Sequence, residues 1–275
     1  MEHIIRLDSA SDSRLSPYSN LRWKSKSLIR HHEFVVEGRL CVQRLLASQL
    51  QVNSVLVQEG REIEATTWIR DRQLPIYVLP AEEIRQLVGF DFHRGFLASA
   101  LRPSLLELSK LDWSQMIHPL ALAVFGVAET ENLGSMLRTA TALGIRDILM
   151  DSRSADPYAR RTVRVSMGNV FKQRFYRLDD PVEQLKEMAN QTQLRTVVTT
   201  LGAGASLLQD WQADHRPVVL VMGNESTGVD SAIEAIANER ITIPMEFGTD
   251  SLNVSVATGI CLYSLVHAFR SLTTG

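Results

Sequence analysis

The sequence predicts an α/β protein of two domains, and two features of the chain carry this prediction. Apolar segments with the short length of β-strands alternate with segments that have the period of amphipathic helices. The alternation then restarts at Pro119, where the unbroken apolar run PLALAVFGV is typical of a parallel strand buried on both faces. A chain of 275 residues has room for two such domains. We place an N-terminal domain at residues 1–110 and a C-terminal domain at residues 111–275.

The N-terminal domain is predicted to be a small α/β domain. Residues 1–13 have no sustained period, so we expect a loose lead-in and a fold that begins near Arg14. The apolar spacing in EFVVEGRLCVQRLLAS predicts a helix over residues 33–48. The elements expected after it are a strand at VNSVLVQ, a helix at 62–70, a strand at PIYVL, a helix at 81–88 and a last strand in GFDFHRGFLASA.

The C-terminal domain is predicted to contain a mostly parallel sheet covered by helices on both faces. After PLALAVFGV, the candidate strands are RDILM, VFKQRFYRL, LRTVVTT, RPVVLVMG and ERITIP. The candidate helices are 132–143, 181–191, 230–237 and 251–272.

The composition excludes several classes of protein. No apolar run is long enough to cross a bilayer, and the amino terminus lacks a secretory signal, so we expect a soluble, cytoplasmic protein without membrane contact. Cys41 and Cys261 lie far apart in apolar helical contexts. They are therefore expected to be buried thiols and not a disulfide or zinc ligands.

The charges are unevenly distributed although the formal net charge is only −2. Residues 14–44 contain seven basic residues against two acidic ones, and residues 153–177 contain seven against one. Two basic islands in a slightly acidic chain indicate a focused contact with a polyanion. Two solvated helix faces explain either island alone equally well.

Three predicted loops after strands carry small polar residues and glycines. They are ETENLGSMLRTATALG, VVLVMGNESTGVD and IPMEFGTDSLNVSVA. Helix caps and tight turns explain part of this pattern, because Asn and Ser cap helices and Gly permits positive φ. Parallel sheets also bind ligands beyond the carboxyl ends of their strands, so the same loops are candidates for a binding site.

Taken together, the three loops resemble the SpoU (TrmH-like) branch of the SPOUT RNA methyltransferases. The resemblance rests on N-x-G-x-x-x-R, then G-N-E-x-x-G, then I-P-M followed by S-L-N-V-S-V-A, in this order and spacing. It covers residues 119–272. Upstream, FVVEGRLCVQRLLAS and GFDFHRGFLASA resemble the substrate-binding domain of the same family, whose fold is similar to that of ribosomal protein L30e.

The resemblance implies methyl transfer from S-adenosylmethionine to a ribose 2′-hydroxyl of RNA, without a metal. Arg138 matches the essential arginine of the family, and the polar residues expected around it are Asn132, Glu225, Ser251 and Asn253. A guanidinium in a protein stays protonated. We therefore expect Arg138 to hold the adjoining phosphate and stabilise the developing alkoxide instead of acting as a general base.

The resemblance also implies a C-terminal domain with a deep trefoil knot that walls in the cofactor, and a homodimer formed through the helix at 251–272. The residues expected to bind the cofactor are Thr200, Leu201, Gly202, Gly223, Asn224, Ile243, Met245 and Leu252.

Other functions remain open at this point. A Rossmann-fold methyltransferase has a glycine-rich loop like LGAGAS, but that loop should follow the first strand of its domain. A non-catalytic RNA-binding protein with the same fold is a further alternative, and the retained polar set weighs against it. Ribosomal RNA is favoured over tRNA as the substrate because of the separate L30e-like domain, and a tRNA 2′-O-methyltransferase is the alternative.

Overall fold

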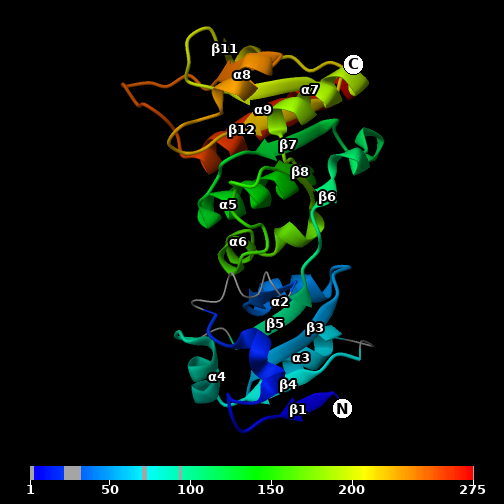
Figure 1. Cartoon of the computed structure of the whole chain (residues 1–275), viewed down its shortest axis with the longest axis vertical. Helices are drawn as coiled ribbons and strands as arrows, with labels where there is room; N and C mark the ends of the chain where they lie inside the picture. Colours follow the sequence, from blue (N-terminus) through cyan, green and yellow to red (C-terminus); the bar gives the residue numbers. More distant parts are fainter. Residues whose placement is uncertain (1–2, 22–31, 70–72, 93–94, 275) are drawn as a thin grey trace. The chain divides into compact units, whose positions relative to one another are not determined.

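The computed structural model describes residues 3–21, 32–69, 73–92 and 95–274 (Figure 1). They form two compact units, one of Met1–Ser104 with Pro157–Phe171 and one of Leu105–Asp156 with Lys172–Gly275. The predicted division after residue 110 lies close to the first of these boundaries. It does not separate Pro157–Phe171, which packs with the first unit although it lies far along the chain.

The first unit contains a five-stranded sheet in the order β1-β4-β3-β5-β2. Its strands are β1 Ile4–Arg6, β2 Glu33–Glu37, β3 Val52–Gln58, β4 Ile76–Leu79 and β5 Phe96–Leu101. Strands β1, β4 and β3 are parallel, whereas β5 runs antiparallel to both β3 and β2. Its helices are η1 Ser13–Tyr18, α2 Arg39–Leu46, α3 Glu62–Ile69, α4 Ala81–Val88 and α6 Arg160–Val165.

Two predictions for the first unit were wrong and one helix was missed. The residues expected to be a loose lead-in include β1, which pairs with β4 from Ile4↔Ile76 onward. The helix predicted over residues 33–48 is a strand followed by a helix, because β2 pairs with β5 and Gly38, at φ +97°, turns the chain into α2. No helix was expected at α6, which packs against β2.

The second unit contains an eight-stranded sheet in the order β11-β13-β10-β12-β7-β8-β9-β6, and every pair in it is parallel. Its strands are β6 Leu106–Glu107, β7 Leu120–Val124, β8 Asp147–Met150, β9 Arg174–Arg177, β10 Arg195–Thr199, β11 Ser206–Leu207, β12 Val218–Met222 and β13 Glu239–Thr242. The six predicted strands are confirmed, and the short β6 and β11 at the two edges were not predicted.

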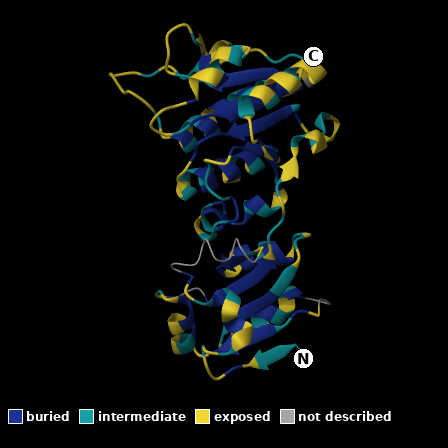
Figure 2. Ribbon diagram, in the orientation of Figure 1, coloured by how far each residue is buried: buried dark blue, intermediate teal, exposed yellow. Residues whose placement is uncertain are grey.

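Helices cover both faces of this sheet. Side chains alternate along a strand, so Ala121 and Ala123 of β7 share one face. They belong to a core cluster with Leu185 of α7 (Pro181–Thr192) and Ile233 of α8 (Ser231–Ile236). Helices α5 (Thr130–Ala142) and α9 (Val254–Thr274) pack against each other, and α9 also contacts β12. Figure 2 shows the strands between these helices as buried.

The four helices predicted in the second unit are confirmed, with bounds α5 Thr130–Ala142, α7 Pro181–Thr192, α8 Ser231–Ile236 and α9 Val254–Thr274. Short 3-10 helices complete the described chain: η2 Leu108–Lys110, η3 Trp113–Gln115, η4 Asn169–Lys172 and η5 Leu208–Asp210. Among the described residues, no helix has the length and apolar character needed to cross a membrane.

Candidate active site

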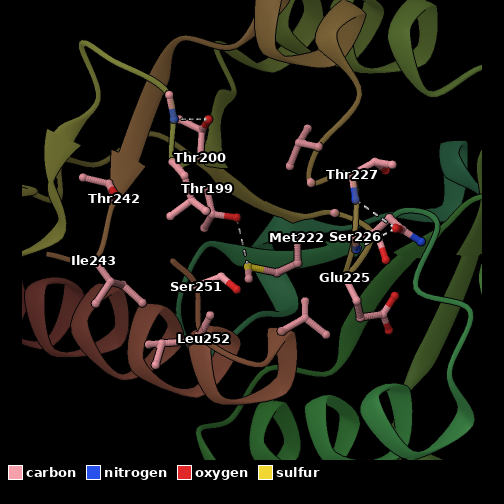
Figure 3. A pocket seen from close by; sticks show the side chains of 18 of the residues that line it. Thr199, Thr200, Met222, Glu225, Ser226, Thr227, Thr242, Ile243, Ser251 and Leu252 are labelled. Atoms are coloured by element: carbon pink, nitrogen blue, oxygen red, sulfur yellow. Dashed lines mark hydrogen bonds between the residues drawn. The ribbon is translucent and has the colours of Figure 1, made fainter. Parts of the chain in front are cut away.

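A cavity of about 410 Å³ lies where β10, β12 and β13 end. These strands are neighbours in a parallel sheet, so their carboxyl ends meet at one edge and the loops that follow them lie together. Figure 3 shows Thr199 and Thr200 on one side of the cavity and Glu225 with its neighbours on the other. All eight residues predicted to bind the cofactor line the cavity, and so do Glu225 and Ser251.

The loop after β12 is held by its own backbone and by one amide side chain. Asn224 and Gly228 exchange two backbone hydrogen bonds, each of 2.9 Å. The Asn224 side chain accepts the N–H groups of Ser226 and Thr227 at 2.8 and 3.1 Å and donates to the Gly126 carbonyl at 2.8 Å. Asn224 therefore shapes this wall of the cavity.

Gly223 occupies a position that admits no side chain. A Cβ there would lie 2.2 Å from the carbonyl carbon and oxygen of Gly228 and 2.3 Å from the nitrogen of Val229. These are backbone atoms, which cannot rotate away as a side chain can. The loop lies this close to the end of β12 only because residue 223 is glycine.

Asp151, directly after β8, supports the same region through Gly126. Its Oδ1 accepts the N–H groups of Gly126 and Ser154 at 3.0 Å each, and its Oδ2 accepts from Arg153 Nε at 2.8 Å. Burial acts to raise the pKa of Asp151, but the hydrogen bonds from Ser154, Gly126 and Arg153 outweigh it and lower that pKa. The carboxylate thus fixes Gly126, which in turn holds Asn224.

The loop after β10 contributes a turn and an apolar surface. Thr200 Oγ1 accepts the N–H of Gly202 at 3.0 Å, which closes a tight turn. Leu201 lies at the tip of that turn and is 64% exposed, although it lines the cavity. Ile243 and Leu252 add apolar side chains from the segment after β13.

A chain of side-chain hydrogen bonds links three elements beside the cavity. Asn132 Nδ2, on α5, donates to Glu225 Oε1 at 2.9 Å, and Asn253 Nδ2 donates to Asn132 Oδ1 at 2.9 Å. Asn253 Oδ1 accepts the N–H of Ser255 at 2.9 Å, so Asn253 also caps α9. The cap and the site use the same residue, and the capping interpretation of this stretch was therefore also right.

Arg138 does not join this chain. It lies on α5 six residues after Asn132, which places the two side chains on different sides of the helix and about 9 Å apart along its axis. Arg138 is exposed and is not among the residues that line the cavity. The structure brings Asn132, Glu225 and Asn253 together and leaves Arg138 apart from them.

Sequence reasoning missed several residues of the cavity wall. They are Met222, Ser226, Thr227, Val229, Glu234, Ile241, Thr242, Asp250, Val254 and Ala257. Most of them adjoin a recognised motif, so the carboxyl end of each strand was a usable signal. Glu234 comes from α8, and nothing in the sequence indicated that it would line the cavity. No group of His, Cys, Asp or Glu side chains in the described part of the chain is arranged to hold a metal ion.

A profile of the SpoU rRNA Methylase family matches residues 119–263. An uncharacterized tRNA/rRNA methyltransferase of Mycobacterium bovis is 32% identical over 246 residues, which are 88% of this chain and 83% of that protein. A 23S rRNA (guanosine-2′-O-)-methyltransferase of Acinetobacter baylyi is 32% identical over 189 residues, 66% of this chain and 74% of that one.

Among solved structures, the AdoMet-bound rRNA methyltransferase of Sinorhizobium meliloti matches with a TM-score of 0.82 at 24% identity, over 98% of this chain and 99% of that one. This similarity bears on the fold. The parallel sheet with a cavity at the carboxyl ends of its strands defines an α/β protein with a ligand-binding site. The chain belongs to the SpoU methylase family. It is an RNA 2′-O-methyltransferase that uses S-adenosylmethionine.

Proposed function

We propose that this enzyme methylates a ribose 2′-hydroxyl of ribosomal RNA in the cytoplasm. The observation that carries the proposal is the 32% identity to a relative named for methylation of 23S rRNA, which extends over 66% of this chain. The main part of the first compact unit, Met1–Ser104, precedes the methylase match, as expected of a family member with a separate RNA-binding domain. Transfer RNA is the competing substrate, and the M. bovis relative carries both RNAs in its name.

The cavity at β10, β12 and β13 is the proposed site for S-adenosylmethionine. Its volume of about 410 Å³ lies within the usual range for small-ligand pockets. Leu201, Ile243 and Leu252 offer apolar surface for an adenine ring, and Gly223 lets backbone approach the ligand closely. When bound, the cofactor supplies an electrophilic methyl group on a sulfonium sulfur. We further propose that residues 243–257 form part of the trefoil knot of the family, which an experimental chain trace tests.

The proposed roles of the polar residues follow from their contacts. The chain Glu225–Asn132–Asn253 fixes α5, α9 and the loop after β12 against one another, so these residues position the acceptor ribose. Arg138 is exposed and charged, so it can grip a phosphate of incoming RNA and stabilise negative charge that develops on the attacking oxygen. In this proposal Arg138 reaches the acceptor only when RNA is bound.

The first unit is the proposed RNA-binding domain, with an L30e-like fold. Within the described residues, many arginines of the basic islands are paired with carboxylates, as in Arg39–Glu64, Arg160–Glu37 and Arg174–Asp147. Arg22, Lys24, Lys26 and Arg30 lie outside the described residues. The contact with RNA therefore depends on fewer free cations than the sequence count indicates, and we expect a moderate salt dependence of binding.

We also propose a homodimer through α9. One face of this helix is exposed, and its apolar side chains Val256, Ile260 and Tyr263 are 51%, 40% and 65% exposed. The opposite face of the helix is buried within its own subunit, and its side chains include Leu262, Leu265, Val266 and Phe269. An exposed apolar stripe at helical spacing indicates a partner surface, since water is a poor solvent for it. The stripe begins three residues after Asn253, so pairing would bring a second chain close to the site.

One experiment tests the proposed substrate. Ribose 2′-O-methyl sites are mapped across all cellular RNA in strains with and without the gene, and the purified enzyme is then assayed on the RNA that loses a site. We expect a single ribosomal RNA position to lose its methyl group. A lost site in tRNA instead would establish the competing substrate, and an unchanged map would refute the proposal.

A further inference from the structure

The segment between β13 and α9 carries an exposed aromatic residue in an unfavourable backbone conformation. Phe247 is fully exposed, at 104% of its reference area, and Figure 2 shows the surrounding segment as exposed. Phe247 and Gly248 have φ of +56° and +70°, and the Thr249 N–H donates to the Glu246 carbonyl at 3.1 Å. Positive φ at both central positions, closed by this hydrogen bond, characterises a type I′ turn.

The first central position of such a turn suits Asn, Asp or Gly. A large side chain with positive φ is an outlier, and such outliers cluster at ligand clamps and active sites. Among the described residues, no packing compensates for the conformation of Phe247, because its ring is entirely exposed. The ring gains contacts only when another molecule covers it.

The position of the turn indicates which molecule that is. The same segment contributes Met245 and Asp250 to the wall of the cavity, on either side of the turn. Any ribose that accepts a methyl group must approach this cavity, and single-stranded RNA is commonly held by stacking of its bases on aromatic side chains. Glu246 directly precedes Phe247, Asp250 follows it by three residues, and both are exposed. Their carboxylates repel phosphate, so they favour contact with the face of a base over contact with the RNA backbone.

We propose that Phe247 stacks on a nucleobase of the RNA substrate beside the acceptor ribose and so positions the RNA for methyl transfer. This inference rests on the proposed function. A second copy of the chain is the rival occupant. The exposed stripe on α9 combines three large side chains, Val256, Ile260 and Tyr263, whereas the turn carries a single ring with an acidic residue before and after it in the sequence. A lone ring among acidic residues suits the face of a base better than an apolar interface between two copies of the chain.

The test compares Phe247→Asn and Phe247→Trp with the unsubstituted enzyme. Asn removes the ring but suits the turn, so folding is preserved, and Trp keeps a stacking surface. Ile117→Asn is the matched control. Ile117 is also a large apolar residue that is 70% exposed, but it precedes β7 and so lies at the amino ends of the strands, away from the cavity. The probes are unmethylated transcripts of ribosomal RNA and of tRNA, with kcat and KM for RNA, cofactor affinity and mass in solution as readouts.

We expect Phe247→Asn to lower kcat/KM for RNA about tenfold, the effect of one stacked base, while cofactor affinity and mass are unchanged. Phe247→Trp should retain most of the activity, and Ile117→Asn should match the unsubstituted enzyme. Activity of Phe247→Asn within twofold overturns the inference, and so does a loss of dimer mass. If the unsubstituted enzyme methylates neither RNA, the proposed function fails. The Phe247 inference is then tested by the RNA affinities of the same variants, and equal affinities of Phe247→Asn and the unsubstituted enzyme overturn it.

Discussion

Replacing Gly223 by alanine tests whether the loop after β12 forms the cofactor site. The added Cβ would stand 2.2 Å from the Gly228 carbonyl, whereas carbon atoms in contact are normally about 3.5 Å or more apart. The loop must therefore move by more than about 1 Å. Such a shift strains the two backbone hydrogen bonds between Asn224 and Gly228 and the bond from Asn224 to Gly126.

The size of the effect follows from these contacts. Overpacking of this kind costs about 1–3 kcal/mol. If the displaced loop must return to its original position before the cofactor binds, this free-energy cost appears as a loss of cofactor affinity of roughly 5- to 150-fold. Isothermal titration calorimetry with S-adenosylmethionine measures it, and a thermal unfolding curve shows whether the variant is folded.

Gly228→Ala provides the matched control. Nothing lies within 4 Å of a Cβ at residue 228, but its φ of +72° disfavours alanine. This variant adds backbone strain of about 1 kcal/mol without a collision, so its affinity should fall less than that of Gly223→Ala. Equal losses in the two variants, or cofactor affinity within twofold for Gly223→Ala, would refute the reasoning.

Three further outcomes are expected. Arg138→Ala should lower methyl transfer by about 100-fold or more while cofactor affinity stays within a few-fold, and Arg138→Lys should restore little, because an ammonium lacks the planar fork; activity of the alanine variant within tenfold contradicts this role. Ile260→Glu should convert a dimer into a single 30.8 kDa chain in light scattering, and an unchanged mass argues against the α9 interface. Because the pKa of Asp151 is lowered in the folded state, its stabilising effect is present above the ordinary carboxyl pKa and is lost as pH falls through the lowered value. Asp151→Asn should therefore show a flatter dependence of melting temperature on acid pH, and parallel curves would exclude this linkage.

The parallel sheet of the second unit was predictable because of how it is buried. Strands such as β7 and β12 are covered on both faces, so their sequences are continuous apolar runs. The N-terminal errors have the opposite cause. Phe34 and Val35 fit a helix period and a strand equally well, and only pairing with β5, more than sixty residues away in the sequence, decides in favour of β2.

The missed elements are short and depend on distant partners. Strand β1 has only three residues and is defined by its pairing with β4. Helix α6 has the sequence RRTVRV, whose charges suggest a solvated segment. Its Val163 is nevertheless buried, and a single sequence carries no signal for the residues that cover it.

The site was predictable as a set of loops but not as a set of contacts. The order of strands and motifs indicates that three loops meet at one edge of the sheet. The hydrogen bond between Asn132 and Glu225 joins residues 93 positions apart, and that between Asn253 and Asn132 spans 121. Helical geometry likewise separates Arg138 from Asn132, although one motif contains both.

The placement of Pro157–Phe171 in the first unit determines how the domains can be separated. This segment is held there by specific contacts: Arg160 Nη1 donates to Glu37 Oε2 at 2.5 Å, and the rings of Phe34 and Tyr158 lie 5.1 Å apart. A fragment that begins at residue 105 keeps the segment but loses β2 and the rest of its partners. Its apolar residues, among them Val163, would then be exposed.

We therefore expect a fragment of residues 105–275 to self-associate in size-exclusion chromatography because an apolar surface is uncovered. The same fragment with residues 157–171 replaced by a Gly/Ser linker should lack this association and still bind S-adenosylmethionine, because every residue of the cavity belongs to the second unit. Calorimetry on the linker fragment gives the decisive result. A linker fragment that folds but does not bind the cofactor would mean that the cavity depends on the first unit, and one that associates as strongly as the plain fragment would mean that α6 is not the exposed surface.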